Sequence, residues 1–381
     1  MKKNRLISLG FIIAAVVFAS FFGGKFSYAL LYASFAVPVT CLIYLLFVFT
    51  RLKVYQAIDS KIVVKGEKIG FKYILSNESS VYFTHIKPEF LSDYSKVDVK
   101  YCGDEISLAP GQKTENLTEL TCLYRGEYMV GLKSIVITDY LRLFKIRRGY
   151  PSTLNIRVYP RIVKLNSLNA LSFGDDIKSP PYTLKAGGEQ DADLRAFAFG
   201  DNVKAVNWKV SAKHGELFTR RRTEPPKEKI ALFIDTSPIT HGDKIPAEDR
   251  ILEVALAVSD FYLGKNIENE IIYPTGTLNR IYVNKREDFM RFYDACLTLP
   301  FKNDEAHNYL ENITTDASTL VLITAKPERF AKALSSFSMQ TCVILTADME
   351  SESLAETHRS LGKASLLHIP EDRSINDALG G

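Results

Sequence analysis

The chain has 381 residues, of which 46% are hydrophobic and 24% charged. At about 150 residues per domain, this length predicts two or three domains, and the composition is that of a folded chain, not a disordered or collagen-like one. The formal net charge of +4 is too small to indicate nucleic-acid binding. The five cysteines have no CxxC or Cys/His spacing, which excludes a disulfide framework and a zinc finger.

Two long apolar segments, residues 6–22 and 28–49, stand near the start of the chain, and the only charged residue in them and their link is Lys25. At 1.5 Å per residue they reach about 25 Å and 33 Å, against a hydrocarbon core of about 30 Å. The alternative is a signal peptide, because the chain begins with a basic stretch. A second, longer segment follows at once, however, and no small-residue cleavage site separates the two. The sequence therefore predicts a transmembrane helical hairpin over residues 1–51.

Positive charge flanks this hairpin on one side. Lys2, Lys3 and Arg5 precede the first segment, and Arg51 and Lys53 follow the second, while the link carries a single lysine. The positive-inside rule then predicts a two-pass protein of the cell membrane, with its N- and C-termini and the rest of the chain in the cytoplasm.

Residues 52–150 have the pattern of a β domain. Ile69, Phe71, Tyr73 and Leu75 recur at every second position, which is typical of a half-buried strand. Turn residues separate several such β-prone runs at intervals of about ten residues. This spacing predicts an all-β, immunoglobulin-like sandwich.

Strands and helices alternate from residue 229 onward. Apolar strands are expected at residues 230–234, 271–273, 280–283, 320–324, 341–346 and 365–369, with helices at 247–263 and from about residues 284, 328 and 351. This alternation is typical of a parallel sheet covered by helices on both faces, the doubly wound class. Residues 229–381 are therefore predicted to form an α/β domain, and residues 151–228 to connect it to the sandwich.

The connector contains the most distinctive segment of the chain, which runs from Asp191 to Leu217 and includes the only tryptophan. It resembles the bacterial family known as domain of unknown function 58, whose pattern is an Arg, an aromatic residue, Gly-Asp, a basic residue, Asn-Trp-Lys, Ser-Ala-basic and Gly-x-Leu. The matching positions are Arg195, Phe197, Gly200, Asp201, Lys204, Asn207, Trp208, Lys209, Ser211, Ala212, Lys213, Gly215 and Leu217. Phe197, Lys204 and Lys213 stand where Tyr, Arg and Arg are usual.

Looser matches precede this segment, at residues 124–128, at Asp139 with residues 143–144, and at residues 158–161. The usual Asp-Pro-aromatic-Gly stretch reads Asp-Tyr-Leu-Arg here. The resemblance covers nearly the whole chain and implies a membrane-anchored protein with a degenerate von Willebrand factor A-like C-terminal domain. Because family members often accompany MoxR-type AAA+ ATPases, it also implies such an ATPase as a partner.

The charged residues of the matching segment have two interpretations. In the first, Arg195, Asp201, Lys204 and Lys209 form a charge network that holds an irregular segment, with Trp208 as its apolar anchor. In the second, they form a site for a ligand or for the acidic tail of a partner.

A second motif, Asp-Thr-Ser-Pro-Ile, begins at Asp235, at the end of the first strand of the α/β domain. It resembles the metal-ion-dependent adhesion motif of von Willebrand factor A domains, Asp-x-Ser-x-Ser, so Asp235 and Ser237 are candidate ligands of Mg²⁺. Ile239 replaces the second serine, and Ala325 stands where an aspartate is often found. We therefore expect a degenerate Mg²⁺ site at most, and no other cofactor. The alternative is that Asp235 and Ser237 cap the following loop.

No HExxH, GxSxG, Walker A or GxGxxG motif occurs in the chain. We therefore expect a non-enzymatic, membrane-anchored scaffold or adaptor with a cytoplasmic protein-interaction domain. Its expected partners are membrane lipid, a MoxR-type AAA+ ATPase and other proteins, in assembly or envelope-related processes. Two alternatives stay open: a metal-dependent enzyme, and an envelope sensor whose sandwich is extracytoplasmic.

Overall fold

The computed structural model describes residues 2–98, 105–149, 154–168, 194–198, 206–220, 229–239, 244–337, 339–348, 351–370 and 373–380. The chain divides into two compact units. The first contains residues 1–162, 236–256 and 287–303, and the second contains residues 163–235, 257–286 and 304–381.

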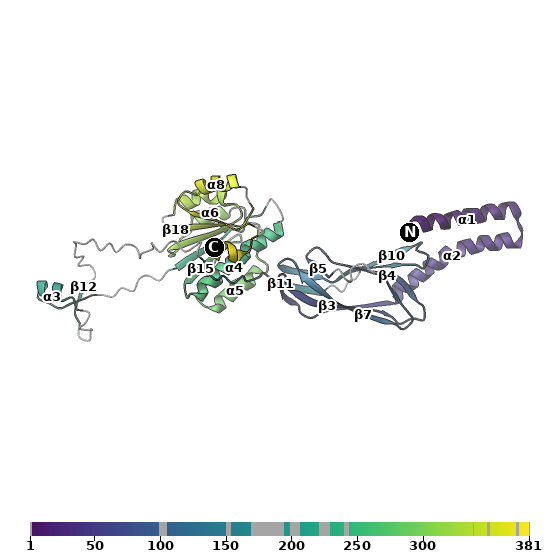
Figure 1. Ribbon diagram of the computed structural model, residues 1–381, viewed down its shortest axis with the longest axis horizontal. Coiled ribbons are helices and arrows are strands. Elements are labelled where there is room, and N and C mark those ends of the chain that lie inside the picture. The colour runs from purple at the N-terminus through teal and green to yellow at the C-terminus, as the bar shows by residue number, and fades with distance from the viewer. Residues whose placement is uncertain are drawn as a thin grey trace. The chain divides into compact units, whose positions relative to one another are not determined.

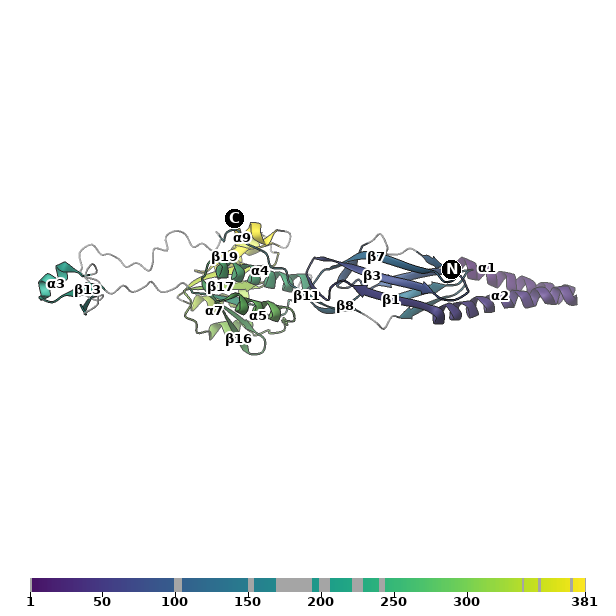
Figure 2. The same ribbon diagram turned by 90° about the horizontal axis from the view of Figure 1, so that it is seen from below.

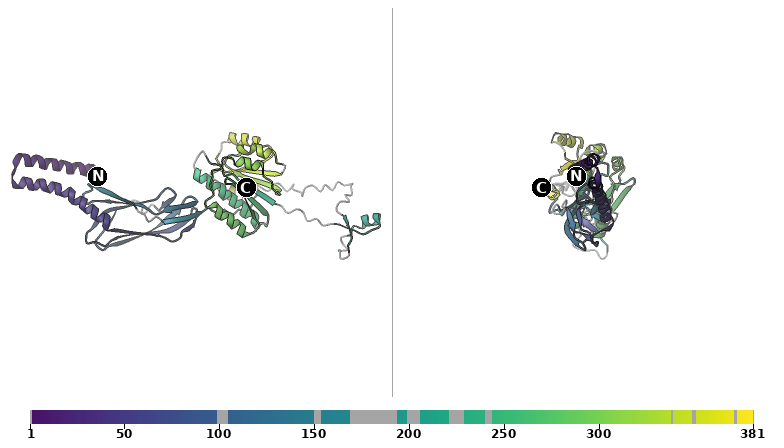
Figure 3. Two further views of the ribbon diagram at one scale, coloured as in Figure 1. Left: turned by 180° about the vertical axis from the view of Figure 1, so that it is seen from behind. Right: turned by 90° about the vertical axis from the view of Figure 1, so that its right-hand side faces the viewer.

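The first unit begins with two helices, α1 (Lys2–Phe22) and α2 (Gly24–Arg51), which lie side by side and antiparallel (Figures 1 and 3). Both are long and apolar enough to cross a membrane. Gly23 and Gly24 have φ angles of 60° and 84°, in the left-handed region that glycine adopts readily, so the chain reverses within this pair. The two predicted apolar helices are confirmed, and the second begins closer to the first than the sequence indicated.

The β region is built from three sheets; strands of the first and third are labelled in Figure 2, and strands of the second in Figure 1. One antiparallel sheet has the order β1 (Leu52–Ile58), β3 (Lys68–Asn77), β7 (Lys113–Cys122) and β5 (Ser95–Val97). A second antiparallel sheet has the order β10 (Lys145–Gly149), β9 (Leu132–Thr138), β4 (Phe83–Phe90) and β6 (Ile106–Leu108). The third sheet has the order β2 (Ile62–Val64), β11 (Leu154–Tyr159) and β8 (Gly126–Val130). The predicted β region is therefore confirmed as a set of paired strands. Strand β11 lies in the expected connector and pairs with both β2 and β8.

The core of this region alternates along its strands as the sequence pattern predicts. Phe71, Tyr73 and Leu75 are at most 1% exposed and pack in one apolar cluster with residues of all three sheets. Leu45 and Val48 from the end of α2 belong to the same cluster. The helix therefore contributes to the folded core of the β region.

The second unit contains a six-stranded sheet of the order β16 (Leu278–Val283), β15 (Glu268–Pro274), β14 (Lys229–Ile234), β17 (Thr319–Thr324), β18 (Gln340–Leu345) and β19 (Ser365–His368). The strands expected from the sequence are all present. Strands β15, β14, β17, β18 and β19, in that order in the sheet, run parallel to one another, whereas β16 is antiparallel to β15. The sheet is therefore mixed, and the prediction of a fully parallel sheet is wrong. The three residues between β15 and β16 are too few for the crossover that a parallel pair needs.

The helices predicted at residues 247–263 and from about residues 284, 328 and 351 are present as α4 (Lys244–Gly264), α5 (Arg286–Cys296), the 3₁₀ helix η4 (Pro327–Phe330) with α7 (Ala331–Ser335), and α8 (Ser351–Ser360). Two short helices that the sequence did not predict are α6 (Ala306–Glu311) and α9 (Ile375–Gly380). On one face of the sheet, Phe233 and Leu322 pack in a buried cluster with Leu310 of α6 and Phe330 of η4. The chain runs outward from β14 to β16 and then returns to β17 on the other side of β14. The strand order therefore reverses between β14 and β17, which in such sheets is the usual place of a ligand site.

Candidate functional site

The segment that resembles the family forms a small folded module. Strand β12 (Leu194–Ala196) pairs antiparallel with β13 (Phe218–Arg220), and the short helix α3 (Trp208–His214) lies between them in the chain. An isolated bridge joins Val206 to Thr219, and both residues are buried. We call residues 194–198 and 206–220 the β12–α3–β13 module.

Three residues of the motif hold this module together through hydrogen bonds to its backbone. Asn207 caps the start of α3 by accepting the N–H of Val210. Ser211 accepts the N–H of Phe218 through its hydroxyl oxygen at 2.9 Å, which ties the helix to β13. Gly215 ends the helix with a φ of 73°, and its N–H donates to the Ser211 carbonyl at 3.0 Å. The Asn, Ser and Gly of the motif are thus explained by local structure.

Trp208 does not anchor the module, contrary to the first interpretation of the sequence. Its side chain is 63% exposed, and Leu217 is 45% exposed. Val210 and Ser211 are buried instead, at 7% and 6%. The reason is helical phase: Trp208 and Ala212 are four residues apart on the exposed side of α3, whereas Val210 and Ser211 lie on the side that carries the bond to β13.

The predicted charge network falls largely outside the described residues. Gly200, Asp201 and Lys204 lie in a stretch that the structure does not describe, and so does the side chain of Arg195. Lys209 is described and exposed on α3.

Asp235 and Thr324 meet where the strand order of the six-stranded sheet reverses. Asp235 follows β14, is 3% exposed, and accepts the hydroxyl proton of Thr324 at 2.6 Å between oxygens. Its backbone N–H donates to the Ile323 carbonyl at 3.0 Å. The Thr324 hydroxyl in turn accepts the N–H of Lys326 at 2.9 Å. The aspartate of the adhesion-like motif is therefore held at the carboxyl edge of the sheet by its neighbours in the fold.

The donors present fit an adhesion-type Mg²⁺ centre poorly. Asp235 supplies a carboxylate that already accepts a bond from Thr324, and Ile239 offers no oxygen. Ser237 is buried, with 4% of its surface exposed. Within the described part of the chain, no three His, Cys, Asp or Glu side chains gather where they could hold a metal. Mg²⁺ prefers six oxygen ligands in near-octahedral geometry, which this set does not approach.

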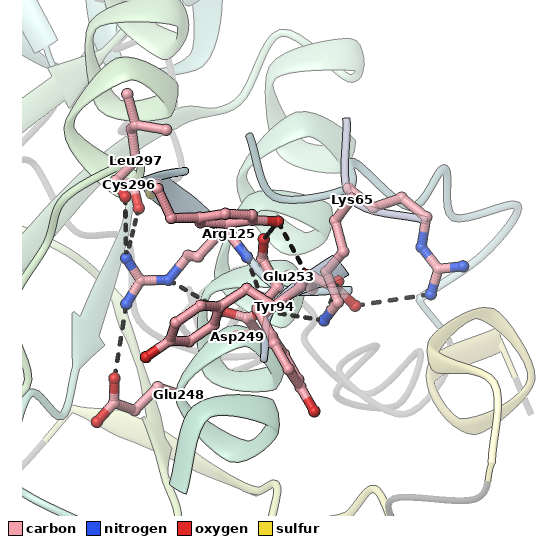
Figure 4. A network of polar contacts seen from close by, with 11 residues as sticks. Lys65, Tyr94, Arg125, Glu248, Asp249, Glu253, Cys296 and Leu297 are labelled. Atoms are coloured by element: carbon pink, nitrogen blue, oxygen red, sulfur yellow. Dashed lines mark hydrogen bonds and ion pairs between the residues drawn. The ribbon is translucent and has the colours of Figure 1, made fainter. Parts of the chain in front are cut away.

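A buried ionic network that the sequence did not predict lies in the first unit (Figure 4). Arg125, in the turn between β7 and β8, places its Nε 3.1 Å from Oδ1 of Asp249 on α4. The same guanidinium donates to the carbonyls of Cys296 and Leu299, at 2.9 Å and 3.0 Å, just where α5 ends. One side chain therefore binds the turn between β7 and β8 to α4 and to the end of α5.

Lys65 completes this network from the turn that follows β2. Its Nζ lies 3.1 Å from Asp249 and 3.0 Å from Glu253, two carboxylates one helical turn apart on α4 with 1% and 3% of their side chains exposed. Arg161 adds a longer contact of 3.6 Å to Glu253. We call Lys65, Arg125, Asp249 and Glu253 the α4 ion network.

Burial dominates the electrostatics of this network. Loss of solvent raises the pKa of the Asp249 carboxyl, and the nearby charges of Lys65 and Arg125 pull that pKa back down in part. Burial also raises the pKa of Glu248, against a smaller opposing effect from Arg125. Removing one partner of such a buried pair is strongly destabilising, because it leaves the other charge buried and uncompensated.

Two of the looser sequence matches converge on α4 and α5. Arg125 belongs to the match at residues 124–128, and Tyr159 to the match at residues 158–161. The Tyr159 ring stacks on that of Tyr293 in α5 at 4.9 Å between centroids, and the Tyr293 hydroxyl donates to the Pro160 carbonyl at 3.1 Å. The sequence signal that was available for the network was a pair of carboxylates spaced i, i+4 in a helix whose other positions are mostly apolar.

Residues 193–270 match the model of a family described as "Protein of unknown function DUF58". This match supports membership of the DUF58 family. The DUF58 segment includes the β12–α3–β13 module, the aspartate after β14 and the two acidic residues of α4.

No curated protein matches the chain. Among solved structures, a FixG-related protein from Vibrio parahaemolyticus is 11% identical and aligns with 28% of this chain and 96% of its own, at a TM-score of 0.19. The secreted serine protease VesC from Vibrio cholerae is 11% identical over 32% of this chain and 26% of its own, at 0.20. The alpha-2-macroglobulin of E. coli is 9% identical over 74% of this chain and 18% of its own, at 0.22. TM-scores this low carry no argument about this chain.

Proposed function

We propose that this protein is a membrane-anchored, non-enzymatic scaffold that binds a partner protein through the β12–α3–β13 module. The observation that supports this proposal is the exposure of Trp208, at 63%, on a module whose buried residues include Val206, Val210, Ser211 and Thr219. Exposed tryptophan side chains are unfavourable in water, and tryptophan is enriched among the residues that dominate the energy of protein interfaces.

The charge around Trp208 indicates the chemistry of the partner. Lys209 and Lys213 are exposed on the same short helix, and the exposed Leu217 follows in the next turn. A surface of one indole, one leucine and two lysines is complementary to a segment that is both apolar and acidic. The family resemblance points to a MoxR-type AAA+ ATPase as the protein that carries such a segment.

The anchor of the scaffold is the α1–α2 hairpin. Its length and apolarity are sufficient for two membrane crossings. The basic residues at its two ends support a two-pass protein of the cell membrane with both termini in the cytoplasm. In this arrangement the module faces cytoplasmic partners.

The two folded parts of the scaffold correspond to known architectures in our proposal. The paired antiparallel sheets of residues 52–159 support an immunoglobulin-like sandwich that spaces the anchor from the rest. The strand order of the six-stranded sheet and the buried Asp235 at its carboxyl edge support a von Willebrand factor A-like domain whose metal site is degenerate.

Site-specific photo-crosslinking tests the proposed contact. A photoreactive residue replaces exposed Ala212, beside Trp208 on α3, and the matched control replaces Tyr282, which is 61% exposed on β16. We expect position 212, and not position 282, to crosslink a AAA+ ATPase in the native membrane. Trp208→Ala should weaken binding of that purified ATPase about 30-fold while leaving the melting temperature unchanged, because the side chain is a contact and not an anchor. Crosslinking from both positions alike, or binding that is unaffected by Trp208→Ala, would contradict the proposal.

A further inference from the structure

The end of α2 is embedded in the β-sandwich. Leu45 and Val48 are 2% and 0% exposed within the sandwich core. The Tyr44 hydroxyl donates to the Tyr82 carbonyl at 3.0 Å and accepts the N–H of Thr84 at 3.1 Å. At 1.5 Å per residue, α2 is about 42 Å long, and its part from residue 44 onward accounts for about 12 Å. The remaining length, about 30 Å, equals the thickness of the hydrocarbon core.

The start of α1 is bound to a loop of the β region. Asn4 donates through its side-chain amide to the Leu141 carbonyl at 2.8 Å, and the Arg5 Nε donates to the Leu143 carbonyl at 2.6 Å. These carbonyls belong to the loop of residues 139–144 between β9 and β10. The loop also contacts α2, because the Tyr140 and Tyr44 rings lie 4.5 Å apart between centroids. The loop is therefore bound to both helices where the hydrocarbon-spanning part of the hairpin ends.

The fold holds this loop with Tyr140 and Leu141 outward and Leu143 buried. Asp139 is fully buried, and its carboxylate accepts the backbone N–H groups of Leu141, Leu143 and Phe144 at 3.1, 3.3 and 2.6 Å. Tyr140 and Leu141 are left 49% and 47% exposed. Tyrosine is enriched at the level of lipid headgroups, where its ring is in an apolar layer and its hydroxyl in a polar one.

A cavity of about 350 Å³ opens between the loop and the two helices. Its lining includes Ile7 and Phe11 of α1, Val37 of α2, and Leu141 and Leu143 of the loop. The first turn of α1 also carries two exposed cations, Lys2 and Lys3. An apolar cavity beside a basic first turn is complementary to a molecule with an acyl chain and an anionic head.

We propose that this cavity, together with Lys2, Lys3 and the loop of residues 139–144, is a binding site for an anionic phospholipid of the leaflet that faces the sandwich. An acyl chain occupies the cavity, and the headgroup phosphate lies against the two lysines, since basic residues at a membrane surface attract anionic lipids. The proposal rests on the proposed membrane anchor and adds a specific lipid to it. It assigns the 139–144 loop a function that the scaffold alone does not require.

Tryptophan fluorescence with brominated lipids tests this site, because Trp208 is the only tryptophan of the chain. In a Trp208→Phe background, the reporter is Tyr140→Trp or, with Tyr140 kept, Leu141→Trp. Tyr94, a tyrosine 41% exposed beside the β5 end of the sandwich, is the matched negative control as Tyr94→Trp. Phe35, 51% exposed in the middle of α2, reports on the anchor as Phe35→Trp. The full-length variants are reconstituted in phosphatidylcholine vesicles that contain a minority of acyl-brominated phosphatidylcholine or acyl-brominated phosphatidylglycerol.

We expect quenching at positions 140 and 141 and none at position 94. At equal mole fraction, brominated phosphatidylglycerol should quench positions 140 and 141 at least about twofold more than brominated phosphatidylcholine. The double change Lys2→Gln/Lys3→Gln should abolish that excess and leave quenching at position 35 unaltered. Equal quenching by the two lipids, or no quenching at positions 140 and 141 while position 35 is quenched, would overturn the lipid site and leave the anchor intact. If position 35 is not quenched, the proposed membrane anchor itself fails.

Discussion

Asp249 and Glu253 are carboxylates on α4 with almost no solvent contact, and such groups destabilise a fold unless cations compensate them. Lys65 and Arg125 provide this compensation from turns far away in the sequence, Arg125 from 124 residues before Asp249. Nothing in the local sequence pairs these residues. The spacing of the two acids predicts a shared helix face, but their burial depends on what packs against that face.

The α4 ion network gives a prediction at the level of single residues. Arg125→Leu should lower the free energy of unfolding by about 3–5 kcal/mol, because it leaves Asp249 buried with less compensation and removes the donors to the Cys296 and Leu299 carbonyls. The measurement is urea-induced unfolding of the full-length protein in mild detergent. The double change Arg125→Leu/Asp249→Leu should recover part of the loss, because it leaves no uncompensated carboxylate.

Arg157 offers a matched control for this substitution. It pairs with Glu127 at 2.8 Å, but 60% and 50% of the two side chains are exposed. Arg157→Leu should therefore cost less than about 1 kcal/mol. Equal effects of Arg125→Leu and Arg157→Leu would show that the buried network does not hold the first unit together.

At the scale of elements, α2 is both a predicted membrane helix and part of a protein core. Its apolar run predicts the helix but does not distinguish residues that face lipid from residues that face the sandwich, because both environments select the same side chains. Leu45 and Leu46 illustrate this limit: the first is 2% exposed and the second 49% exposed, although they are adjacent and identical in type.

This pair of leucines gives a prediction about α2. Leu45→Ala should lower the free energy of unfolding of the sandwich by about 2–4 kcal/mol, since it removes buried atoms from the core and leaves a cavity. Leu46→Ala should change it by no more than about 0.5 kcal/mol. Thermal unfolding in one detergent compares the two variants. An equal loss in both would mean that the end of α2 does not belong to the sandwich core.

The helix α3 and the strand β16 show the same limit in other elements. The motif on α3 predicted a distinctive segment, yet the exposure of Trp208 depends on which side of a single helical turn faces β13. The apolar run of β16 predicted a strand, but its antiparallel direction follows from the short turn after β15.

At the scale of the whole molecule, the proposed topology places residues 52–381 on one side of the membrane. Trypsin added to inverted vesicles should therefore degrade this part and leave a protected hairpin fragment, whereas trypsin added to intact spheroplasts should leave residues 52–381 uncut, because Lys25 in the link between the helices is the cleavage site that the topology places outside. Immunoblots against tags at the two termini follow both digestions. Cleavage within residues 52–381 in spheroplasts would favour the alternative of an envelope sensor with an extracytoplasmic sandwich.

Local patterns along the chain were sufficient to predict the two apolar helices, the β character of residues 52–150 and the alternation of strands and helices after residue 229. Each of these depends on length and periodicity within one element, which the sequence states directly. The tertiary structure alone decided that Lys65 and Arg125 meet the acids of α4, that Asp235 is bound by Thr324, and that the 139–144 loop contacts both apolar helices, α1 and α2. These contacts bring together residues that are mostly distant in the chain, and they depend on how whole elements pack, which no local pattern encodes.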